Sequence, residues 1–227
     1  MGSARPRARV IAIDGPAASG KGTLAARIAD HLGFAHLDTG SLYRAVGLIV
    51  LRNGDSATDR PAAITAARSL CPERAPAVLR DSEIRSDRVG QAASTVAAIP
   101  EVRAALLGFQ REFAADPPGA AAGAVLDGRD VGTVICPDAD AKLFVTASVE
   151  VRAQRRLKEL QARGVNAIDS HVLADMKDRD RRDSERATAP LVKAADAFVL
   201  DTSDMTADQA FEAALGFIRS RIGPDAA

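Results

Sequence analysis

One glycine-rich stretch restricts the fold of this 227-residue chain more than any other feature. It follows a short β-branched run, RVIAIDG at residues 9–15, and precedes an alanine-rich helical pattern, TLAARIADHL, that stops at Gly33. Small residues let successive backbone N–H groups surround phosphate oxygens, and the N-terminus of the following helix adds positive potential. The pattern therefore predicts a strand, a phosphate-binding loop and a helix, in that order. The loop consists of Gly15, Pro16, Ala17, Ala18, Ser19, Gly20, Lys21, Gly22 and Thr23.

The loop differs in one way from the common spacing G-x-x-x-x-G-K-(S/T), because Gly22 separates Lys21 from Thr23. We expect Lys21 to bind the β- and γ-phosphates of ATP and to act in catalysis, and we expect the Thr23 hydroxyl to contact Mg²⁺. Glycine-rich turns also join strands to helices without binding any ligand. Here, however, the strand, the loop, the lysine and the helix all coincide, which favours phosphate binding.

Further apolar runs alternate with helical patterns along the chain. The runs are GAVLDGRD, AKLFVTAS and AFVLDTS, and the last of them precedes a helical pattern near residues 208–222. Continuous apolar strands that alternate with helices predict a parallel sheet covered on both faces, and so an α/β fold. A GTPase is disfavoured, because the chain has no NKxD motif and carries DGRD where a GTPase has DxxG after such a strand.

Two regions interrupt this alternation. Residues 53–100 mix turn formers with short patterns such as AVLRDSEIR, which fit either a small hairpin or an irregular connection in an inserted lobe. Residues 151–191 are helical and densely charged. A solvated helix pair linked by salt bridges explains that charge pattern. A lid over bound phosphates also explains it, because Arg179, Arg182 and Arg186 recur at spacings that place them on one face of a continuous helix.

The composition narrows the classes of partner. The 30 basic and 30 acidic residues give a formal net charge of zero, which argues against binding to a nucleic-acid backbone. No stretch approaches the roughly 18 apolar residues of a membrane helix, and the run at residues 10–13 is too short for a signal peptide. Cys71 and Cys136 form no CxxC pair. We expect a cytoplasmic monomer with no nucleic-acid or membrane partner.

The segment LDTGSLYR, residues 37–44, stands where a second strand would end and a helix begin. Thr39 or Ser41 could cap that helix, with Arg44 simply exposed on its surface. Beside a phosphate loop the segment favours a second interpretation. Arg44 would lie one turn into the helix, where its planar guanidinium suits the phosphate of an acceptor nucleotide.

Five blocks of this sequence resemble, in order and spacing, those of bacterial cytidylate kinases, which phosphorylate CMP and dCMP. The blocks are GPAASGKGT, LDTGSLYR, QAASTVAAIPEVR, DGRDVGT and DRDRRDSERATAPL. The resemblance spans nearly the whole chain and implies a P-loop NTPase fold in one domain, residues 1–227. It places a core at about 8–37, 104–150 and 192–227, a nucleoside-monophosphate lobe at about 38–103, and a short helical lid at about 151–191. The insert near residues 80–89 is shorter than in that family.

The resemblance also implies roles for individual side chains. Ser94, Arg103 and Asp130 stand at positions that read cytosine. The remaining expected substrate-binding residues are Thr39, Arg44 and Arg129, with Arg179 and Asp183 on the ribose side and Arg186 as a further arginine of the site. The expected catalytic residues are Lys21, Arg129, Arg179 and Arg182. Cytosine presents an amino donor and two acceptors, which a carboxylate and a guanidinium complement.

The expected reaction is transfer of the γ-phosphoryl group of ATP to CMP or dCMP, giving ADP and CDP or dCDP, with Mg²⁺. His31, His36 and His171 lie outside the phosphate-loop and DGRD blocks. No general base is needed, because the acceptor phosphate has a second pKa of roughly 6 and is mostly ionised at neutral pH. The alternatives are a related kinase for adenylate, uridylate or shikimate, and a nucleotide-binding regulatory module without turnover.

Overall fold

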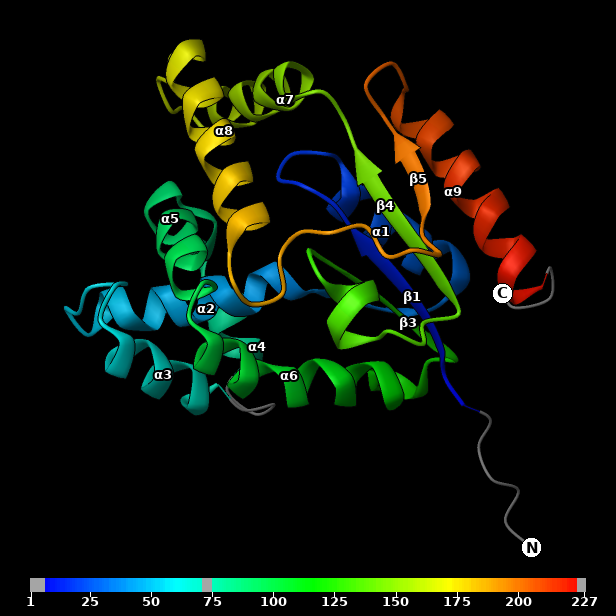
Figure 1. The fold of residues 1–227 in the computed structure, drawn as a ribbon, viewed down its shortest axis with the longest axis horizontal. Helices are drawn as coiled ribbons and strands as arrows, with labels where there is room; N and C mark the ends of the chain where they lie inside the picture. Colours follow the sequence, from blue (N-terminus) through cyan, green and yellow to red (C-terminus); the bar gives the residue numbers. More distant parts are fainter. Residues whose placement is uncertain (1–6, 71–74, 224–227) are drawn as a thin grey trace, which may run out of the picture.

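The computed structural model describes residues 7–70 and 75–223, and Figure 1 shows how their helices and strands are arranged. In these residues a five-stranded sheet has the order β2-β3-β1-β4-β5, and every pairing in it is parallel. The predicted parallel sheet is therefore confirmed, and its short second strand ends within LDTGSLYR. The strands are β1 (Arg9–Asp14), β2 (Ala35–Asp38), β3 (Gly123–Gly128), β4 (Ala141–Thr146) and β5 (Phe198–Asp201).

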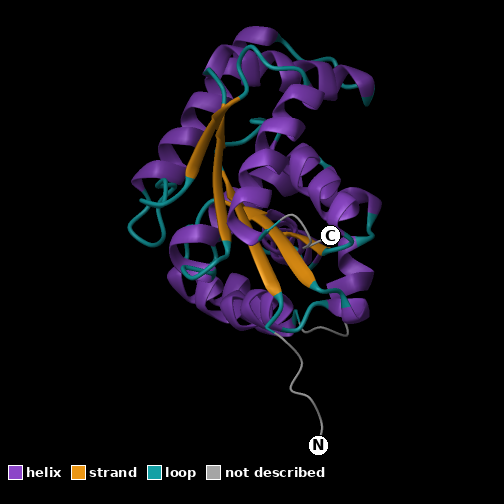
Figure 2. Cartoon of the chain, turned by 90° about the vertical axis from the view of Figure 1, so that its right-hand side faces the viewer, coloured by secondary structure: helices purple, strands orange, loops and turns teal. Residues whose placement is uncertain are grey.

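Helices cover both faces of the sheet, as Figure 2 shows. No single helix in the described parts of the chain is long and apolar enough to span a membrane; residues 87–96 and 100–120 pass that test only as a pair, bent by 100°. The helices are α1 (Lys21–Leu32), α2 (Thr39–Arg52), α3 (Arg60–Ser69), α4 (Ala75–Leu79), α5 (Asp87–Val96), α6 (Pro100–Ala115), α7 (Val149–Ala162), α8 (Asp169–Glu185) and α9 (Ala207–Ile222), with short turns η1 (Ser82–Arg85), η2 (Pro118–Ala120) and η3 (Val131–Ile135).

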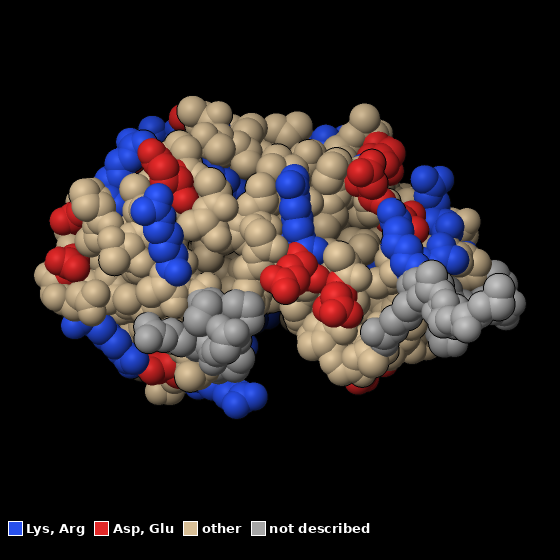
Figure 3. Space-filling model, turned by 90° about the horizontal axis from the view of Figure 1, so that it is seen from below, with Lys and Arg blue, Asp and Glu red and all other residues tan. Residues whose placement is uncertain are grey.

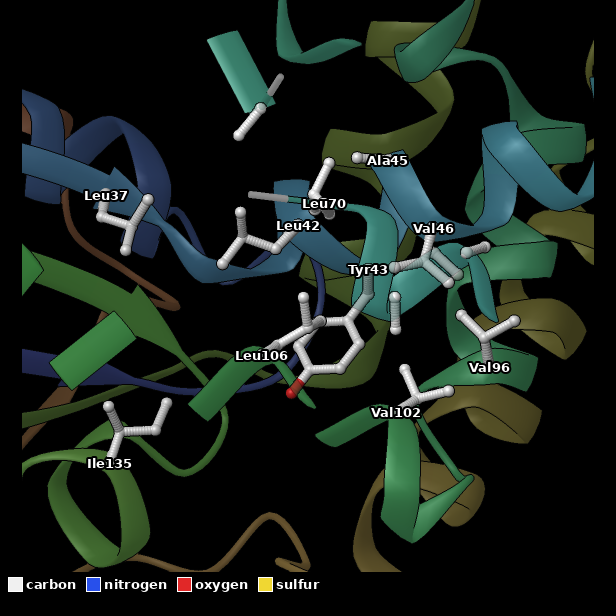
Figure 4. Packing of buried hydrophobic residues seen from close by; sticks show 14 of the residues in the cluster. Leu37, Leu42, Tyr43, Ala45, Val46, Leu70, Val96, Val102, Leu106 and Ile135 are labelled. Carbon is white, nitrogen blue, oxygen red and sulfur yellow. The ribbon is translucent and has the colours of Figure 1, made fainter. Parts of the chain in front are cut away.

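Strand β1 lies in the middle of the sheet, and its side chains alternate between two hydrophobic clusters. Val10 and Ala12 pack in the cluster that includes α2 and α6, whereas Ile11 and Ile13 pack in the cluster that includes α1 and α9. Successive side chains of a strand point to opposite faces of a sheet. Strand β1 is therefore buried on both sides, and Figure 4 shows the first cluster around Tyr43.

The ends of two helices determine how the chain reaches the site. Gly33 ends α1 in the left-handed conformation, with φ of 63°, as its position predicts. The prediction that Thr39 or Ser41 caps α2 is wrong, because Asp38 is the capping residue and its carboxylate accepts the backbone N–H of Ser41. The Thr39 hydroxyl instead donates to the backbone carbonyl of Asp127 at 2.8 Å, and this bond joins α2 to β3.

The inserted region is helical where it is described. Residues 75–96 form α4, η1 and α5, so the hairpin alternative for AVLRDSEIR is wrong. Helix α5 packs closely on α2, and a Cβ at Gly47 of α2 would lie 3.0 Å from the Ala92 side chain. A larger residue at this position would force the two helices apart by a few tenths of an ångström. Residues 71–74, which include Cys71, lie outside the described residues.

Helices α7 and α8 pack on one another and form what we call the α7–α8 pair. Its apolar side chains pack on one another and on the phosphate loop, in a small cluster of Ala17, Ala153, Leu160, Val172 and Met176. Helix α8 ends at Glu185, and Arg186 follows in an extended conformation, with ψ of 137°. The expected arginine face is therefore incomplete. The helix ends one residue before Arg186, so Arg186 does not share a helical face with Arg179 and Arg182.

Charged side chains hold the α7–α8 pair together, which the salt-bridge interpretation expects. Arg152 of α7 makes two hydrogen bonds to the carboxylate of Asp180 of α8, at 3.1 and 2.6 Å. The face in Figure 3 carries basic and acidic side chains in separate small groups, with uncharged surface between.

Candidate active site

A cavity of about 320 Å³ lies at the carboxyl ends of β1, β2 and β3. Ligands of open parallel sheets bind at this edge. The cavity is bounded by the loops that follow these strands, by α2 and α5 on one side, and by the α7–α8 pair on the other. The residues that line it are Ala17, Ala18, Lys21, Gly22, Asp38, Thr39, Gly40, Tyr43, Arg44, Ala93, Ser94, Ala97, Arg103, Asp127, Gly128, Arg129, Asp130, Arg156, Glu159, Met176, Arg179, Asp183 and Arg186.

The phosphate loop connects β1 to α1 in a conformation that its small residues permit. Gly15 has φ of 155°, and a Cβ there would lie 2.0 Å from the carbonyl oxygen of Val145 in β4. Gly20 is left-handed, with φ of 87°, immediately before α1 begins. The loop therefore passes against β4 at a distance that only glycine allows, and then turns directly into the helix.

Side chains outside the loop hold its carbonyl groups. Arg152 donates to the carbonyl of Ala17 at 3.3 Å, and the Thr202 hydroxyl donates to that of Ser19 at 3.1 Å. Arg155 donates to the same Ser19 carbonyl at 3.4 Å and to the Thr202 hydroxyl at 3.0 Å. These contacts fix the loop from the side of α7 and β5. A fixed loop can bind phosphate without reorganising its backbone.

Lys21 lies at the base of the cavity, where its Nζ donates to the carbonyl of Pro16 at 3.2 Å. Burial and the positive charge of Arg129 lower the pKa of Lys21 to about 7. An anionic phosphate beside Nζ would oppose both effects and favour the charged form. This position is the one expected for a lysine that binds phosphates.

The structure does not bring Thr23 into this cavity. Gly22 faces it instead, and a Cβ at Gly22 would lie 3.7 Å from a carboxylate oxygen of Asp127. Thr23 lines a second hollow, of about 280 Å³, on the other side of the loop. The extra glycine after the lysine shifts the hydroxyl by one helical position, and this rotates it away from the site. The Mg²⁺ contact expected of Thr23 has no counterpart in this arrangement.

Two carboxylates occupy the region that Thr23 does not reach. Asp38 and Asp127 end neighbouring strands and pair with one another in the register of β2 and β3. Burial, followed by the negative charge of Asp127, raises the pKa of Asp38. His36 Nε2 lies 2.8 Å from Asp127 Oδ1. Asp127 is buried and Asp38 is exposed to the cavity, and adjacent carboxylates of this kind favour a cation between or beside them. Neither aspartate was predicted as a site residue from the sequence, although both stand at the ends of apolar runs.

The residues expected to read a base lie together at the wall formed by α2, α5 and α6. Arg103 donates to Asp130 Oδ2 at 2.5 Å, and Arg186 approaches the other oxygen of that carboxylate at 3.8 Å. The Arg103 guanidinium lies over the ring of Tyr43, 5.2 Å from its centroid. The buried hydroxyl of Ser94 has no protein partner in the structure. A planar ligand with donors and acceptors on one edge could satisfy these groups.

The residues expected to bind phosphate lie between this wall and the phosphate loop. Arg129 donates to Asp183 Oδ2 at 2.8 Å. Burial and the charge of Arg129 lower the pKa of Arg179 to about 10, and the Nε of Arg179 has no partner in the structure. Burial lowers the pKa of Arg44, although its Nη1 donates to the carbonyl of Ile84. The cavity therefore holds an excess of positive charge that anions would stabilise.

Two contacts join the α7–α8 pair to the inserted helices beside the mouth of the cavity. Arg156 of α7 forms an ion pair with Asp87 of α5. Arg163, at the end of α7, donates to the backbone carbonyl of Arg85 at 3.0 Å. We call these two interactions the mouth contacts. They connect two segments that are far apart in the sequence and that face one another across the cavity.

Arg182 does not point into the cavity, unlike the other predicted arginines. It is exposed, and its Nη2 donates to Gln91 Oε1 of α5 at 3.4 Å. Gly15 and Pro16 line neither hollow, whereas Ser19, Gly20 and Thr23 line the second one. The other predicted site residues all line the main cavity. The residues that the sequence analysis missed there include Asp38, Tyr43, Asp127, Arg156, Glu159 and Met176.

The geometry agrees with the comparisons to known proteins. The family model described as Cytidylate kinase matches residues 11–220. This chain belongs to the cytidylate kinase family. It is 63% identical over 212 residues to the cytidylate kinase of Paramagnetospirillum magneticum, covering 93% of this chain and 98% of that relative. It is 61% identical over 209 residues to the cytidylate kinase of Rhodospirillum rubrum, covering 92% and 96%.

Among solved structures, the crystal structure of an uncharacterized protein from Eubacterium ventriosum is similar in fold. Its TM-score is 0.52 at 14% sequence identity, with 94% of this chain and 99% of that chain covered. At such low identity the similarity concerns the fold alone. The assignment of this chain to the cytidylate kinases therefore rests on the family model and the close relatives, and not on this similarity in fold.

Proposed function

We propose that this chain transfers the γ-phosphoryl group of ATP to CMP or dCMP, giving ADP and CDP or dCDP. The observation that carries the proposal is that one cavity joins the phosphate loop to the Arg103–Asp130 pair. Phosphate binding at one end and a polar edge for a base at the other fit two nucleotides placed end to end. A regulatory module without turnover would have no use for the arginines between them.

The donor nucleotide is proposed to bind across the phosphate loop. Its phosphates would lie on the loop and on Lys21, with the N-terminus of α1 adding positive potential. Its adenine would lie in the second hollow, which Arg155, Thr202 and Met205 line beside the loop. A guanidinium and a thioether can both pack against an aromatic base.

The acceptor nucleotide is proposed to bind at the wall of α2, α5 and α6. Asp130 would accept from the cytosine amino group, and Arg103 and Ser94 would donate to ring acceptors. The same site would leave Asp130 facing the carbonyl oxygen of uracil. UMP should therefore lose about 1 to 3 kcal/mol of binding energy relative to CMP.

The residues present fit the Mg²⁺ ion that the family uses with ATP. Mg²⁺ is bound in nucleotide sites by one or two carboxylates together with phosphates and water. Asp38 and Asp127 would hold it, in place of the Thr23 hydroxyl expected from the sequence. When bound, the ion would neutralise charge on the donor phosphates. In the described residues no group of three or more His, Cys, Asp or Glu side chains forms a metal site of its own.

Transfer itself would depend on positioning and on charge. Lys21, Arg129 and Arg179 surround the space between the donor and acceptor ends of the cavity, where negative charge spreads during phosphoryl transfer. Asp183 orients Arg129 through its hydrogen bond at 2.8 Å. Arg44 would bind the acceptor phosphate. The α7–α8 pair would act as a lid that excludes water, while residues 38–103 bind the nucleoside monophosphate.

A coupled assay of ADP release across the common nucleoside monophosphates tests the proposal. CMP and dCMP should be phosphorylated, and UMP and AMP should react far more slowly. Lys21→Ala and Arg129→Ala should each abolish transfer while the protein stays folded. Rates on UMP or AMP that equal those on CMP would refute the choice of base, and activity retained in either variant would refute the mechanism. A monomeric state and a cytoplasmic location stay predictions, which sedimentation and cell fractionation would test.

A further inference from the structure

A buried carboxylate outside the cavity joins two of the loops that form it. Asp14 is the last residue of β1 and is only 4% exposed. Its Oδ1 accepts the backbone N–H of Val131 at 2.8 Å, and its Oδ2 accepts that of Gly132 at 2.8 Å. Both oxygens of one carboxylate are thus used on consecutive amides of a second segment.

The two segments that Asp14 joins carry the donor and the acceptor functions of the site. Gly15, the first residue of the phosphate loop, follows Asp14 directly. Arg129 and Asp130, which line the cavity, come directly before Val131. The carboxylate therefore fixes the distance between the phosphate loop and the loop of residues 129–132, which we call the acceptor loop.

Close packing leaves little tolerance in this arrangement. A Cβ at Gly132 would lie 3.4 Å from Asp14 Oδ2 and 3.2 Å from the Lys142 side chain. Burial raises the pKa of Asp14 to about 6, against the opposing effect of the two backbone hydrogen bonds. The charge of Asp130 raises it further, whereas that of Lys21 lowers it. A buried carboxylate is costly unless hydrogen bonds compensate for its lost hydration, and here two backbone N–H groups supply that compensation.

We propose that Asp14 is a positioning residue, which holds the acceptor loop in register with the phosphate loop so that Arg129 and Asp130 meet the acceptor nucleotide. The inference rests on the proposed function. It adds a role for a residue that touches neither nucleotide. Both hydrogen bonds require acceptors at both side-chain oxygens, and among the neutral side chains of similar size none provides two. An asparagine would direct its NH2 group at one of the two N–H donors.

Steady-state kinetics of Asp14→Asn test this role. We expect kcat/KM for CMP to fall at least about tenfold, as when groups that orient active-site residues are removed. The loss should appear mainly in KM for CMP, because Arg129 and Asp130 both move, while KM for ATP stays at the wild-type value. A structural role alone would lower the melting temperature and leave the ratio of KM for CMP to KM for ATP unchanged. Equal changes in both KM values, or no change in either, would overturn the proposal.

Asp140→Asn provides a matched control. Asp140 accepts the backbone N–H of Val10 at 2.8 Å, so it anchors the opposite end of the same strand, far from the cavity. This variant should lower stability without changing either KM value. A CMP-selective loss in Asp140→Asn would show that any disturbance of β1 has this effect, and would overturn the proposal.

A second variant covers the case in which Asp14→Asn does not fold. Gly132→Ala would place a methyl group 3.4 Å from Asp14 Oδ2 and 3.2 Å from the Lys142 side chain, so that the acceptor loop or these neighbours must shift by a few tenths of an ångström. We expect a smaller rise in KM for CMP, again with KM for ATP unchanged. Unchanged KM values in this folded variant would overturn the proposal. Failure of the proposed function is distinguishable, since the wild-type protein itself would then not phosphorylate CMP.

Discussion

Replacing Asp130 by asparagine should destabilise the protein strongly even without nucleotide. Asp130 is the counterion of Arg103, at 2.5 Å, and of Arg186, at 3.8 Å. The side chains of Arg103 and Asp130 are 8% and 5% exposed. In Asp130→Asn two arginines stay close together and largely buried, without the negative charge that they share. The asparagine oxygen can still accept hydrogen bonds, but the neutral amide cannot offset two positive charges.

The size of the effect follows from that burial. Removing one partner of a buried ion pair costs about 3 to 5 kcal/mol, because the remaining charge is left uncompensated. For a domain of this size each kcal/mol shifts the melting temperature by about 2 to 4 °C. We therefore expect the melting temperature of Asp130→Asn to fall by about 6 to 20 °C, whereas an exposed ion pair of similar geometry should contribute about a tenth to a third as much.

Differential scanning calorimetry of the nucleotide-free protein provides the measurement. The control is Asp87→Asn, which breaks the ion pair with Arg156, because the Asp87 side chain is 52% exposed. We expect the control to shift the melting temperature by only about 2 °C. Equal shifts in the two variants would refute the reasoning, since burial would then not determine the cost of losing the carboxylate.

Other substitutions test the placement of single residues. Arg179→Ala should lower kcat at least about 100-fold, because its guanidinium lines the cavity. Arg182→Ala should change kcat little, and equal losses would contradict its position outside. ATP affinity measured by calorimetry should fall as the pH rises from about 7 to about 9, because Lys21 has a pKa of about 7 and loses its charge in the free protein; Lys21→Met should lack this pH dependence. Gly15→Ala should not fold, because its Cβ would lie 2.0 Å from the Val145 carbonyl; a wild-type melting curve would contradict this.

The sequence predicts the features that depend on local patterns. The phosphate loop, the ends of α1 and the buried strands follow from residue types within a few positions of one another. The positions of Ser94, Arg103 and Asp130 in the cavity were expected only from the family resemblance, because they come from segments that meet only in the folded chain. Their spacing alone indicates no shared site.

The features that the sequence did not predict depend on register and on where a helix stops. Asp38 and Asp127 are adjacent because β2 and β3 pair in one particular register, which no local pattern determines. Arg186 leaves α8 because the helix ends at Glu185, so the helical spacing of the arginines in the sequence did not give a shared face. Thr23 points away from the cavity because one added glycine rotates the following residues around α1.

The mouth contacts have a consequence for turnover. Arg156 and Asp87, and Arg163 and the Arg85 carbonyl, connect the two sides of the cavity in the absence of nucleotide. Nucleotides that pass between these two segments would have to break both contacts, on entry and again on release. Each catalytic cycle then includes an opening step, as in many enzymes whose release of products limits the overall rate. Because the ion pair is partly exposed, dissolved salt screens it. Moderate ionic strength would therefore speed opening. The contacts that help to exclude water during phosphoryl transfer would then also limit the rate of turnover.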